Sequence, residues 1–222
     1  MFRSSTLLLS LLVVGSLAAS PYRLASTGPH PTSAATLTGR RIAVDTAVFA
    51  GGCFWGIEGV FEHVKGVMSA TAGYAGGNSA SPSYEEVSTE TTGHAESVQV
   101  VYDPAKVSYQ QLLQVFFLVA HDPTQLNRQG PDVGTSYRSA IFFRSAAQQK
   151  AAAAYVAELT KKRRYPHPIV TEIVPLKAFY RAEDYHQHYM ALHPDQPYIV
   201  YNDAPKLVRL KQTFPAWYQE PR

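Results

Sequence analysis

Hydrophobic positions along this chain repeat with two different periods, which predict an alternation of strands and helices. Short apolar runs and alternating apolar positions predict strands at residues 47–50, 66–74, 98–102, 140–143 and 169–174. Apolar residues spaced three and four apart, or serine caps before such residues, predict helices near residues 54–64, 108–119, 145–162 and 183–191. Residues 81–83 are expected to open a further short helix that carries Tyr84 and Val87. Strands and helices mixed in this order favour an α+β fold with helices packed on a mixed sheet.

Two regions lack any hydrophobic period. Residues 121–136 contain Asp122-Pro123 and Gly130-Pro131, and we interpret them as a long functional loop. Residues 21–41 are rich in proline, serine, threonine and alanine, which is typical of a flexible spacer. The folded domain is therefore expected to cover residues 42–222.

The first twenty residues have the layout of a secretory signal peptide. Arg3 precedes an apolar run from Leu7 to Leu17, and small residues follow it up to position 20. This run is short for a membrane span. We expect a signal peptide at residues 1–20 and export, with a bacterial periplasm as the destination. The alternative is a segment that stays uncleaved and anchors the protein to the membrane.

Composition narrows the function further. The chain has 222 residues, 45% of them hydrophobic and 17% charged, as in a globular domain with tails. A net charge of +3 is too small to indicate a nucleic acid or a membrane surface as a partner. The sequence contains one cysteine and so forms no internal disulfide. An unpaired thiol in an exported protein calls for a functional explanation.

That cysteine, Cys53, lies in the stretch GGCFWG at residues 51–56, between a predicted strand and a predicted helix. Unpaired N–H groups and the positive end of the helix dipole stabilise a thiolate in such a position. The adjacent Gly52 allows a substrate to approach the backbone closely. The alternative is a buried cysteine that serves as a small hydrophobic residue. The glycines and the aromatic pair Phe54 and Trp55 favour a catalytic nucleophile.

Several motifs resemble the methionine sulfoxide reductase A family. They follow one another between about residues 48 and 218 as GGCFWG, GYAGG, SYEEV, TGHAE, HDPTQLNRQGPDVGTSYRSAIF and AEDYHQHY. The resemblance implies a two-layer α/β plait (ferredoxin-like) with a mixed sheet and long loops. It also implies reduction of the S-epimer of methionine sulfoxide, free or in proteins, without a bound cofactor. Residues 42–222 would then be the catalytic domain.

The resemblance also implies roles for individual residues. Cys53 would be the nucleophile, and Phe54 and Trp55 would form an apolar cage for the substrate methyl group. The sulfoxide oxygen would be surrounded by Tyr84, Glu96 and Tyr137. The other residues expected at the substrate are Gly52, Asp132 and His186.

The expected chemistry makes independent sense of Glu96. A thiolate that attacks a sulfoxide sulfur needs an acid nearby to protonate the oxygen. Glu96 has the same strand parity as Val98 and Val100 and should therefore face the buried side. Burial raises the pKa of a carboxyl group and keeps it protonated near neutral pH. Without the motif, Glu96 would be interpreted as a solvated residue at a strand end, and Tyr84 and Tyr137 as ordinary packing.

Three histidines raise the question of a metal site. His186 and His188 are two residues apart, which places them on different faces of a helix, and His121 is distant in the sequence. No cysteine or carboxylate set in the sequence completes a ligand group with them. We therefore expect packing or supporting roles for the histidines, and no metal.

The reaction would leave a sulfenic acid on Cys53. Because the sequence has no second cysteine, an external thiol must reduce this sulfenic acid. Thioredoxin-like proteins, glutaredoxin with glutathione or a periplasmic thiol relay could supply it, and dithiothreitol could in vitro. We expect a monomer that binds methionine sulfoxide and a thiol reductant protein. Two other classes stay open: a thiol hydrolase with a histidine base, and a non-catalytic module that binds oxidised methionine.

Overall fold

The computed structural model describes residues 43–78, 80 and 82–220. The expected signal peptide and spacer, residues 1–20 and 21–41, lie outside this part of the chain. Within it, none of the helices combines the length and the apolar character that crossing a bilayer requires.

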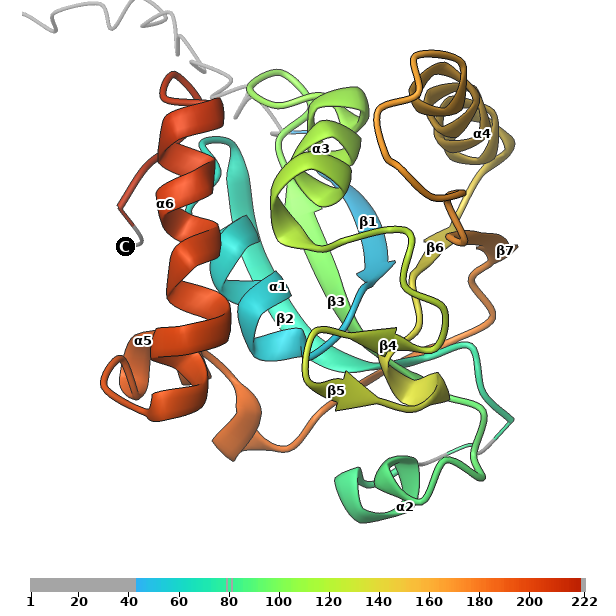
Figure 1. Cartoon of the computed structure of the whole chain (residues 1–222), viewed down its shortest axis with the longest axis vertical. Helices are drawn as coiled ribbons and strands as arrows, with labels where there is room; N and C mark the ends of the chain where they lie inside the picture. The colour runs from blue at the N-terminus through green and yellow to red at the C-terminus, as the bar shows by residue number, and fades with distance from the viewer. Residues whose placement is uncertain (1–42, 79, 81, 221–222) are drawn as a thin grey trace, which may run out of the picture. The chain divides into compact units, whose positions relative to one another are not determined.

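The fold is built on one six-stranded sheet with the strand order β7-β6-β1-β3-β2-β8 (Figure 1). Its strands are β1 (Asp45–Ala50), β2 (Val67–Ala75), β3 (Ala95–Tyr102), β6 (Ala140–Phe143), β7 (Glu172–Pro175) and β8 (Phe179–Arg181). The pair β6–β7 is parallel and the other neighbours are antiparallel. The expected mixed sheet in an α+β fold is therefore confirmed.

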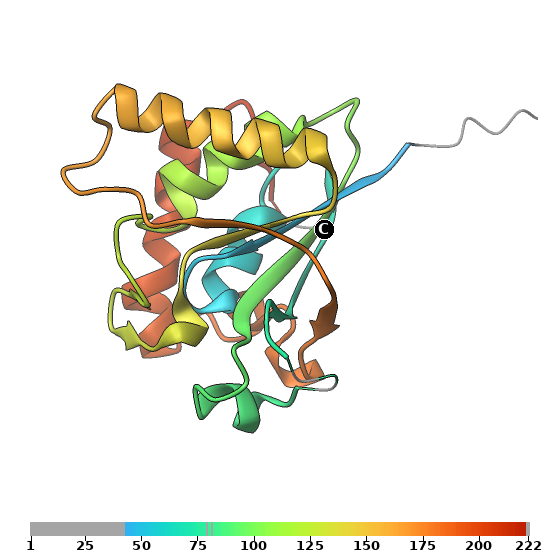
Figure 2. The same ribbon diagram turned by 90° about the vertical axis from the view of Figure 1, so that its right-hand side faces the viewer.

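The helices α1, α3 and α6 lie on one side of this sheet (Figures 1 and 2). The α-helices are α1 (Phe54–Glu62), α2 (Tyr84–Ser88), α3 (Tyr109–Val115), α4 (Ala146–Lys161), α5 (Tyr189–Leu192) and α6 (Ala204–Thr213). Two π-helical segments, η1 (Phe116–Ala120) and η4 (Ile199–Asp203), follow α3 and precede α6, and two 3₁₀ segments are η2 (Thr135–Tyr137) and η3 (Asp184–His186).

Alternation along β1 explains why both faces of the sheet are buried. Ala47 and Phe49 belong to the main core beneath the helices. Val48 and Ala50 point the other way into a second cluster, against which residues of the segment 174–179 pack. In the main core, the Phe49 ring stacks on Phe61 of α1 and on Phe116 after α3, with centroid distances of 5.2 and 4.8 Å.

Serine caps fix where three helices begin. The predicted capping box at Ser108 is confirmed: its hydroxyl accepts from the Gln111 N–H, and the Gln111 side chain accepts from the Ser108 N–H. Ser83 forms an equivalent box with Glu86, and the Ser145 hydroxyl accepts from the Gln148 N–H. These contacts satisfy N–H groups that a helix leaves unpaired at its start.

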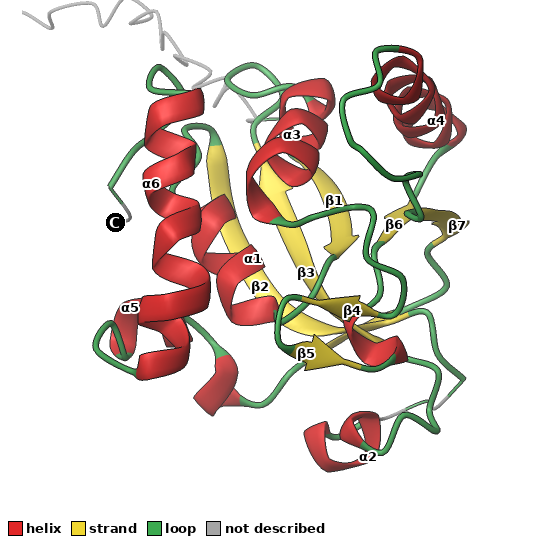
Figure 3. Cartoon of the chain, viewed as in Figure 1, coloured by secondary structure: helices red, strands yellow, loops and turns green. Residues whose placement is uncertain are grey.

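The structure differs from the sequence prediction mainly towards the C-terminus. The helix expected at 183–191 is divided into η3 and α5, because His188 between them has a left-handed backbone with φ 55°. The strand expected at 169–174 begins only at Glu172, and the sequence patterns missed β8 and α6. The loop at 121–136 carries a small hairpin of β4 (Arg128–Gln129) and β5 (Asp132–Val133) (Figure 3).

We predict that Phe49→Ala lowers the free energy of unfolding by about 3–5 kcal/mol, because the ring is fully buried between two others. Urea denaturation would measure the loss. Val208→Ala on the exposed side of α6 is the control and should change stability by less than about 0.5 kcal/mol. Equal losses in the two variants would contradict the central place of Phe49 in the core.

Candidate active site

Cys53 lies at the turn from β1 into α1, as the sequence predicts, and is the N-cap residue of the helix. Two glycines shape this turn. A Cβ on Gly51 would lie 2.8 Å from the His121 ring, and one on Gly52 would lie 2.5 Å from the Gln129 side chain. Gly52 also has φ +97°, a backbone conformation that favours glycine. A side chain is therefore excluded at both positions of the turn before the thiol.

The Cys53 side chain opens into a cavity of about 180 Å³. Residues from five separate segments line this cavity: Cys53, Phe54, Trp55, Tyr84, Glu96, Asp132, Tyr137 and Tyr198. Most of the residues singled out from the sequence thus lie together around the thiol. The lining is largely aromatic, with two carboxyl groups and three phenol groups among its polar members.

Glu96 on β3 is 4% exposed and points to the buried side, as its strand parity indicates. The backbone N–H of Phe54 donates to its Oε2 over 3.0 Å, which joins the carboxyl group to the first turn of α1. Burial raises the pKa of Glu96 to about 8, and the charge of Asp132 adds to this effect. Glu96 is therefore protonated at neutral pH and able to donate a proton.

The thiol itself departs from the expectation of an activated thiolate. Burial raises the pKa of Cys53 well above its ordinary value, and Glu96 and Asp203 raise it further when they are ionised. The N–H of Trp55 at the helix start lowers the pKa of Cys53, as expected, but its effect is smaller than that of burial. The helix terminus alone does not ionise the cysteine, because the same enclosure that protects the site also removes water from the thiol.

Tyr84 and Tyr137 supply neutral O–H groups to the cavity. Burial and the nearby Glu96 raise the pKa of both phenols above its ordinary value, so both keep their protons. Contacts outside the cavity hold the two residues in place. The Tyr84 N–H donates to Glu183 over 2.9 Å, and the Ser136 hydroxyl and N–H beside Tyr137 donate to Glu90.

The indole of Trp55 is held by three neighbouring rings. Its ring stacks on Tyr189 at a centroid distance of 3.7 Å and meets the edge of Tyr198 at 5.9 Å. Its N–H donates to Nδ1 of His186 over 3.1 Å. His186 and Gly52, both expected at the substrate, do not line the cavity. His186 is buried behind Trp55 and Phe54, and Gly52 serves the turn before the thiol.

Sequence reasoning missed Tyr198 as a residue of the site. Its hydroxyl donates to Asp132, so the two residues close the cavity from the C-terminal segment and the long loop. Burial raises the pKa of Asp132, while the bond from Tyr198 lowers it. A single tyrosine among fourteen in the chain gives no signal of this role, which depends on the distant Asp132.

The comparisons with known proteins agree with this geometry. The model of the peptide methionine sulfoxide reductase family matches residues 45–217. The chain belongs to this family. It is 59% identical to peptide methionine sulfoxide reductase MsrA 2 of Mesorhizobium japonicum, over 79% of this chain and 90% of that protein. It is 45% identical to the protein of the same name from Synechocystis sp., over 91% and 94% of the two chains.

Solved structures give the same result. Reduced Mxr1 from Saccharomyces cerevisiae matches with a TM-score of 0.63 and 37% identity, over 69% of this chain and 87% of that one. Methionine sulfoxide reductase A of Corynebacterium diphtheriae matches with a TM-score of 0.61 and 37% identity, over 75% and 86%. As a member of the family, the chain is a peptide-methionine (S)-S-oxide reductase that returns methionine sulfoxide to methionine and repairs oxidised proteins.

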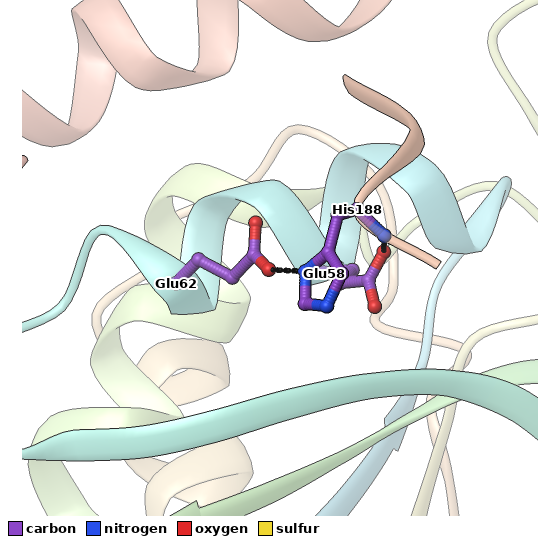
Figure 4. A group of neighbouring side chains, drawn as sticks. All are labelled: Glu58, Glu62 and His188. Atoms are coloured by element: carbon purple, nitrogen blue, oxygen red, sulfur yellow. Dashed lines mark hydrogen bonds and ion pairs between the residues drawn. The ribbon is translucent and has the colours of Figure 1, made fainter. Parts of the chain in front are cut away.

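A second polar cluster joins α1 to the segment that carries His188 (Figure 4). Its members are Glu58, Glu62 and His188, whose possible ligand atoms all lie within 4.8 Å of one another. This corrects the expectation that no carboxylates accompany His188. Glu58 accepts from the N–H groups of Ala72 and His188, and the His188 ring contacts Glu62 over 2.5 Å. These bonds attach the C-terminal segment to α1 and explain the unusual backbone of His188.

A larger cavity of about 750 Å³ adjoins this cluster and includes Glu62 and His188 in its lining. It shares no lining residue with the cavity at Cys53. Volume alone would therefore point to the wrong end of α1, since the groups able to reduce a sulfoxide surround the smaller cavity.

The cluster predicts a pH dependence of stability. Burial and Glu62 raise the pKa of Glu58 to about 7, and Glu62 raises that of His188. Both groups hold a proton more tightly when folded, so stability should fall as the pH rises from about 5 to 8. Glu62→Gln removes a cause of both shifts and should flatten the fall in melting temperature. Glu158→Gln on α4 is the control, and an unchanged slope in Glu62→Gln would contradict the coupling.

Proposed function

We propose that Cys53 is the nucleophile of the reductase and that Glu96 is its general acid. The Cys53 thiolate gives an electron pair to the sulfoxide sulfur, and Glu96 passes its proton to the oxygen. The oxygen ends on Cys53 as a sulfenic acid, the substrate leaves as the thioether, and Glu96 is left as a carboxylate. Cysteine sulfur is thereby oxidised by two electrons and substrate sulfur is reduced by two.

The observation that carries this assignment is a protonated carboxyl group in the same small cavity as the only cysteine. An exposed glutamate would be ionised at neutral pH and could accept a proton but not give one. The Phe54 N–H holds Glu96 at the start of the helix that carries Cys53. Acid and nucleophile are thus fixed to the same helical turn.

The other cavity residues suit the remaining parts of the substrate. Phe54 and Trp55 offer apolar surface to the terminal methyl group, and stacking on Tyr189 keeps the indole rigid. Tyr84 and Tyr137 donate O–H groups to the sulfoxide oxygen and share the developing charge. Asp132, held by Tyr198, supports the polar side of the cavity. A thiol hydrolase is disfavoured, because His186 and His121 bond to Trp55, Phe116 and Ser139 and do not line the cavity.

The single cysteine supports resolution of the sulfenic acid by an external thiol. Two thiols are consumed: the first forms a mixed disulfide on Cys53 and releases water, and the second frees the cysteine. A thioredoxin-like protein, or glutaredoxin with glutathione, fits this requirement, and no bound cofactor takes part. We further propose that the enzyme acts as a monomer.

We also propose that the enzyme is exported to a bacterial periplasm, on the basis of the signal-like residues 1–20, with membrane anchoring as the alternative. For the fold, we propose a ferredoxin-like plait at its centre. The antiparallel order β6-β1-β3-β2, with α1 and α3 in the two crossovers, supports that assignment.

The role of Glu96 is tested by Glu96→Gln. We expect the single-turnover rate of sulfenic acid formation to fall by roughly 10²–10⁴-fold, the usual scale of general acid catalysis. The wild-type rate should fall as the pH rises through about 8, because Glu96 then loses the proton that it donates. The rate of the variant should not show this fall. Rapid-quench assays with the S-epimer of a methyl sulfoxide would measure both. Glu158→Gln is the control, and a wild-type rate at neutral pH in Glu96→Gln would remove Glu96 from this role.

The single cysteine predicts one turnover without reductant. Each chain should release one methionine and then carry one additional oxygen on Cys53, because no second thiol is present to form an internal disulfide. Intact-mass analysis and a sulfenic-acid probe would detect this state, and added glutathione should convert it to a single adduct. A mostly covalent dimer on non-reducing gels would contradict the enclosed position of Cys53, which is only 8% exposed.

A further inference from the structure

A buried ion pair near Cys53 takes no part in the chemistry described so far. Asp203 ends η4 and is 0% exposed, and Lys206 in α6 contacts its Oδ1 over 2.9 Å. The other carboxylate oxygen, Oδ2, has no hydrogen-bond partner among the residues that the structure describes. An unpaired buried oxygen opposes folding, so its retention calls for an explanation in function.

The position of the pair is fixed by Gly56 in the first turn of α1. A Cβ on this glycine would lie 2.0 Å from Asp203 Oδ1 and 2.6 Å from Lys206 Nζ, so both charged groups press against the helix backbone. Gly56 follows Cys53 by three residues, and residues three apart lie on the same side of a helix. The ion pair therefore lies on the side of α1 that carries the thiol.

The proposed reaction needs protonation states of Cys53 and Glu96 that burial alone does not produce. Cys53 must lose its proton while Glu96 keeps one. Yet the thiol has the higher pKa of the two, since burial raises that of Glu96 to about 8 and that of Cys53 well above its ordinary value. A nearby positive charge favours the thiolate and offsets part of the effect of burial. Lys206 is the cation whose charge lowers the pKa of Cys53.

We propose that Asp203 and Lys206 are positioning residues that set the ionisation of Cys53. Lys206 stabilises the thiolate, and Asp203 holds Lys206 in place while its own negative charge disfavours the thiolate. The opposite effects of their charges on the pKa of Cys53 support this, since Asp203 raises it and Lys206 lowers it. Asp203 gives Lys206 a fixed place near the thiol, which a lysine stem without a partner would not keep. The inference rests on Cys53 as the proposed nucleophile.

The pH dependence of Cys53 alkylation by iodoacetamide tests the proposal in the full chain. Lys206→Met should move the midpoint of alkylation to higher pH and slow the reaction at pH 7 by roughly tenfold, as a shift of one unit would. Asp203→Asn should move the midpoint to lower pH and speed the reaction at pH 7, because Lys206 keeps an oxygen acceptor and its charge is no longer opposed. Shifts of opposite sign are not expected from a general loosening of the fold.

Matched variants keep the result clear. Lys206→Arg should retain a midpoint close to that of the wild type, and Lys211→Met, which removes a cation further along α6, should leave it unchanged. If Lys206→Met does not fold, the double variant Asp203→Asn with Lys206→Met replaces it, because removing both charges leaves no unpaired ion in the core. In that case it is compared with Asp203→Asn, which differs from it only by Lys206, and its midpoint should lie at higher pH.

Shifts of the same sign in the two single variants, or no shift in either, would overturn the proposal. Equal midpoints of the double variant and Asp203→Asn would overturn it as well. Alkylation reports on the thiol without turnover, so such a failure would leave Cys53 in place as the nucleophile. A wild-type protein whose Cys53 is alkylated as expected but which does not reduce a sulfoxide would instead count against the proposed reaction.

Discussion

The hydrogen bond from the Phe54 N–H to Glu96 joins the two halves of the site. It links the first turn of α1, where Cys53 is the N-cap, to β3 in the middle of the sheet. β1 and β3 are neighbours with a fixed antiparallel register. The strand that leads into Cys53 therefore also fixes the position of Glu96 along β3. Loss of this register would separate nucleophile and acid even if both residues stayed buried.

Enclosure gives the site its chemistry and also creates its main electrostatic difficulty. The same burial that keeps Glu96 protonated also keeps Cys53 a thiol, because removing water disfavours both charged forms. Donors at the helix start do not reverse this effect on the thiol. Charge must come from elsewhere in the fold, and the structure brings Lys206 from a helix about 150 residues away in sequence to the same turn of α1.

Local signals in the sequence were sufficient for the elements around Cys53. The period-two pattern of β3 placed Glu96 on the buried side, and the capping boxes marked where helices begin. Signals failed where tertiary contacts decide the backbone. His188 breaks a helix because its N–H bonds to Glu58, which is distant in the chain. Strand β8 has only three residues, too few to show a period.

The residues of the candidate site also fall into two groups, those that the sequence predicts and those that only tertiary contacts reveal. Residues within conspicuous motifs could be named from the sequence, whereas Tyr198 acquires its role only through Asp132 in the long loop. Gly52 and His186 are expected at the substrate but do not line the cavity, because a motif identifies a neighbourhood and not which of its residues reach the substrate. The ionisation of Cys53 is beyond what the sequence can predict, since a strand-to-helix turn reveals nearby dipoles but not the depth of burial that raises the pKa of the thiol.

The segment from Tyr198 to Lys206 therefore completes the site that the GGCFWG turn begins. Tyr198 closes the cavity, and Asp203 and Lys206 bring opposite charges to the thiol side of α1. Gly56 makes this approach possible, because any side chain there would displace the ion pair. The geometry of the turn and the charge near its sulfur thus depend on two distant parts of the chain. Packing of α6 against α1 couples them, so the reactivity of Cys53 is a property of the whole fold.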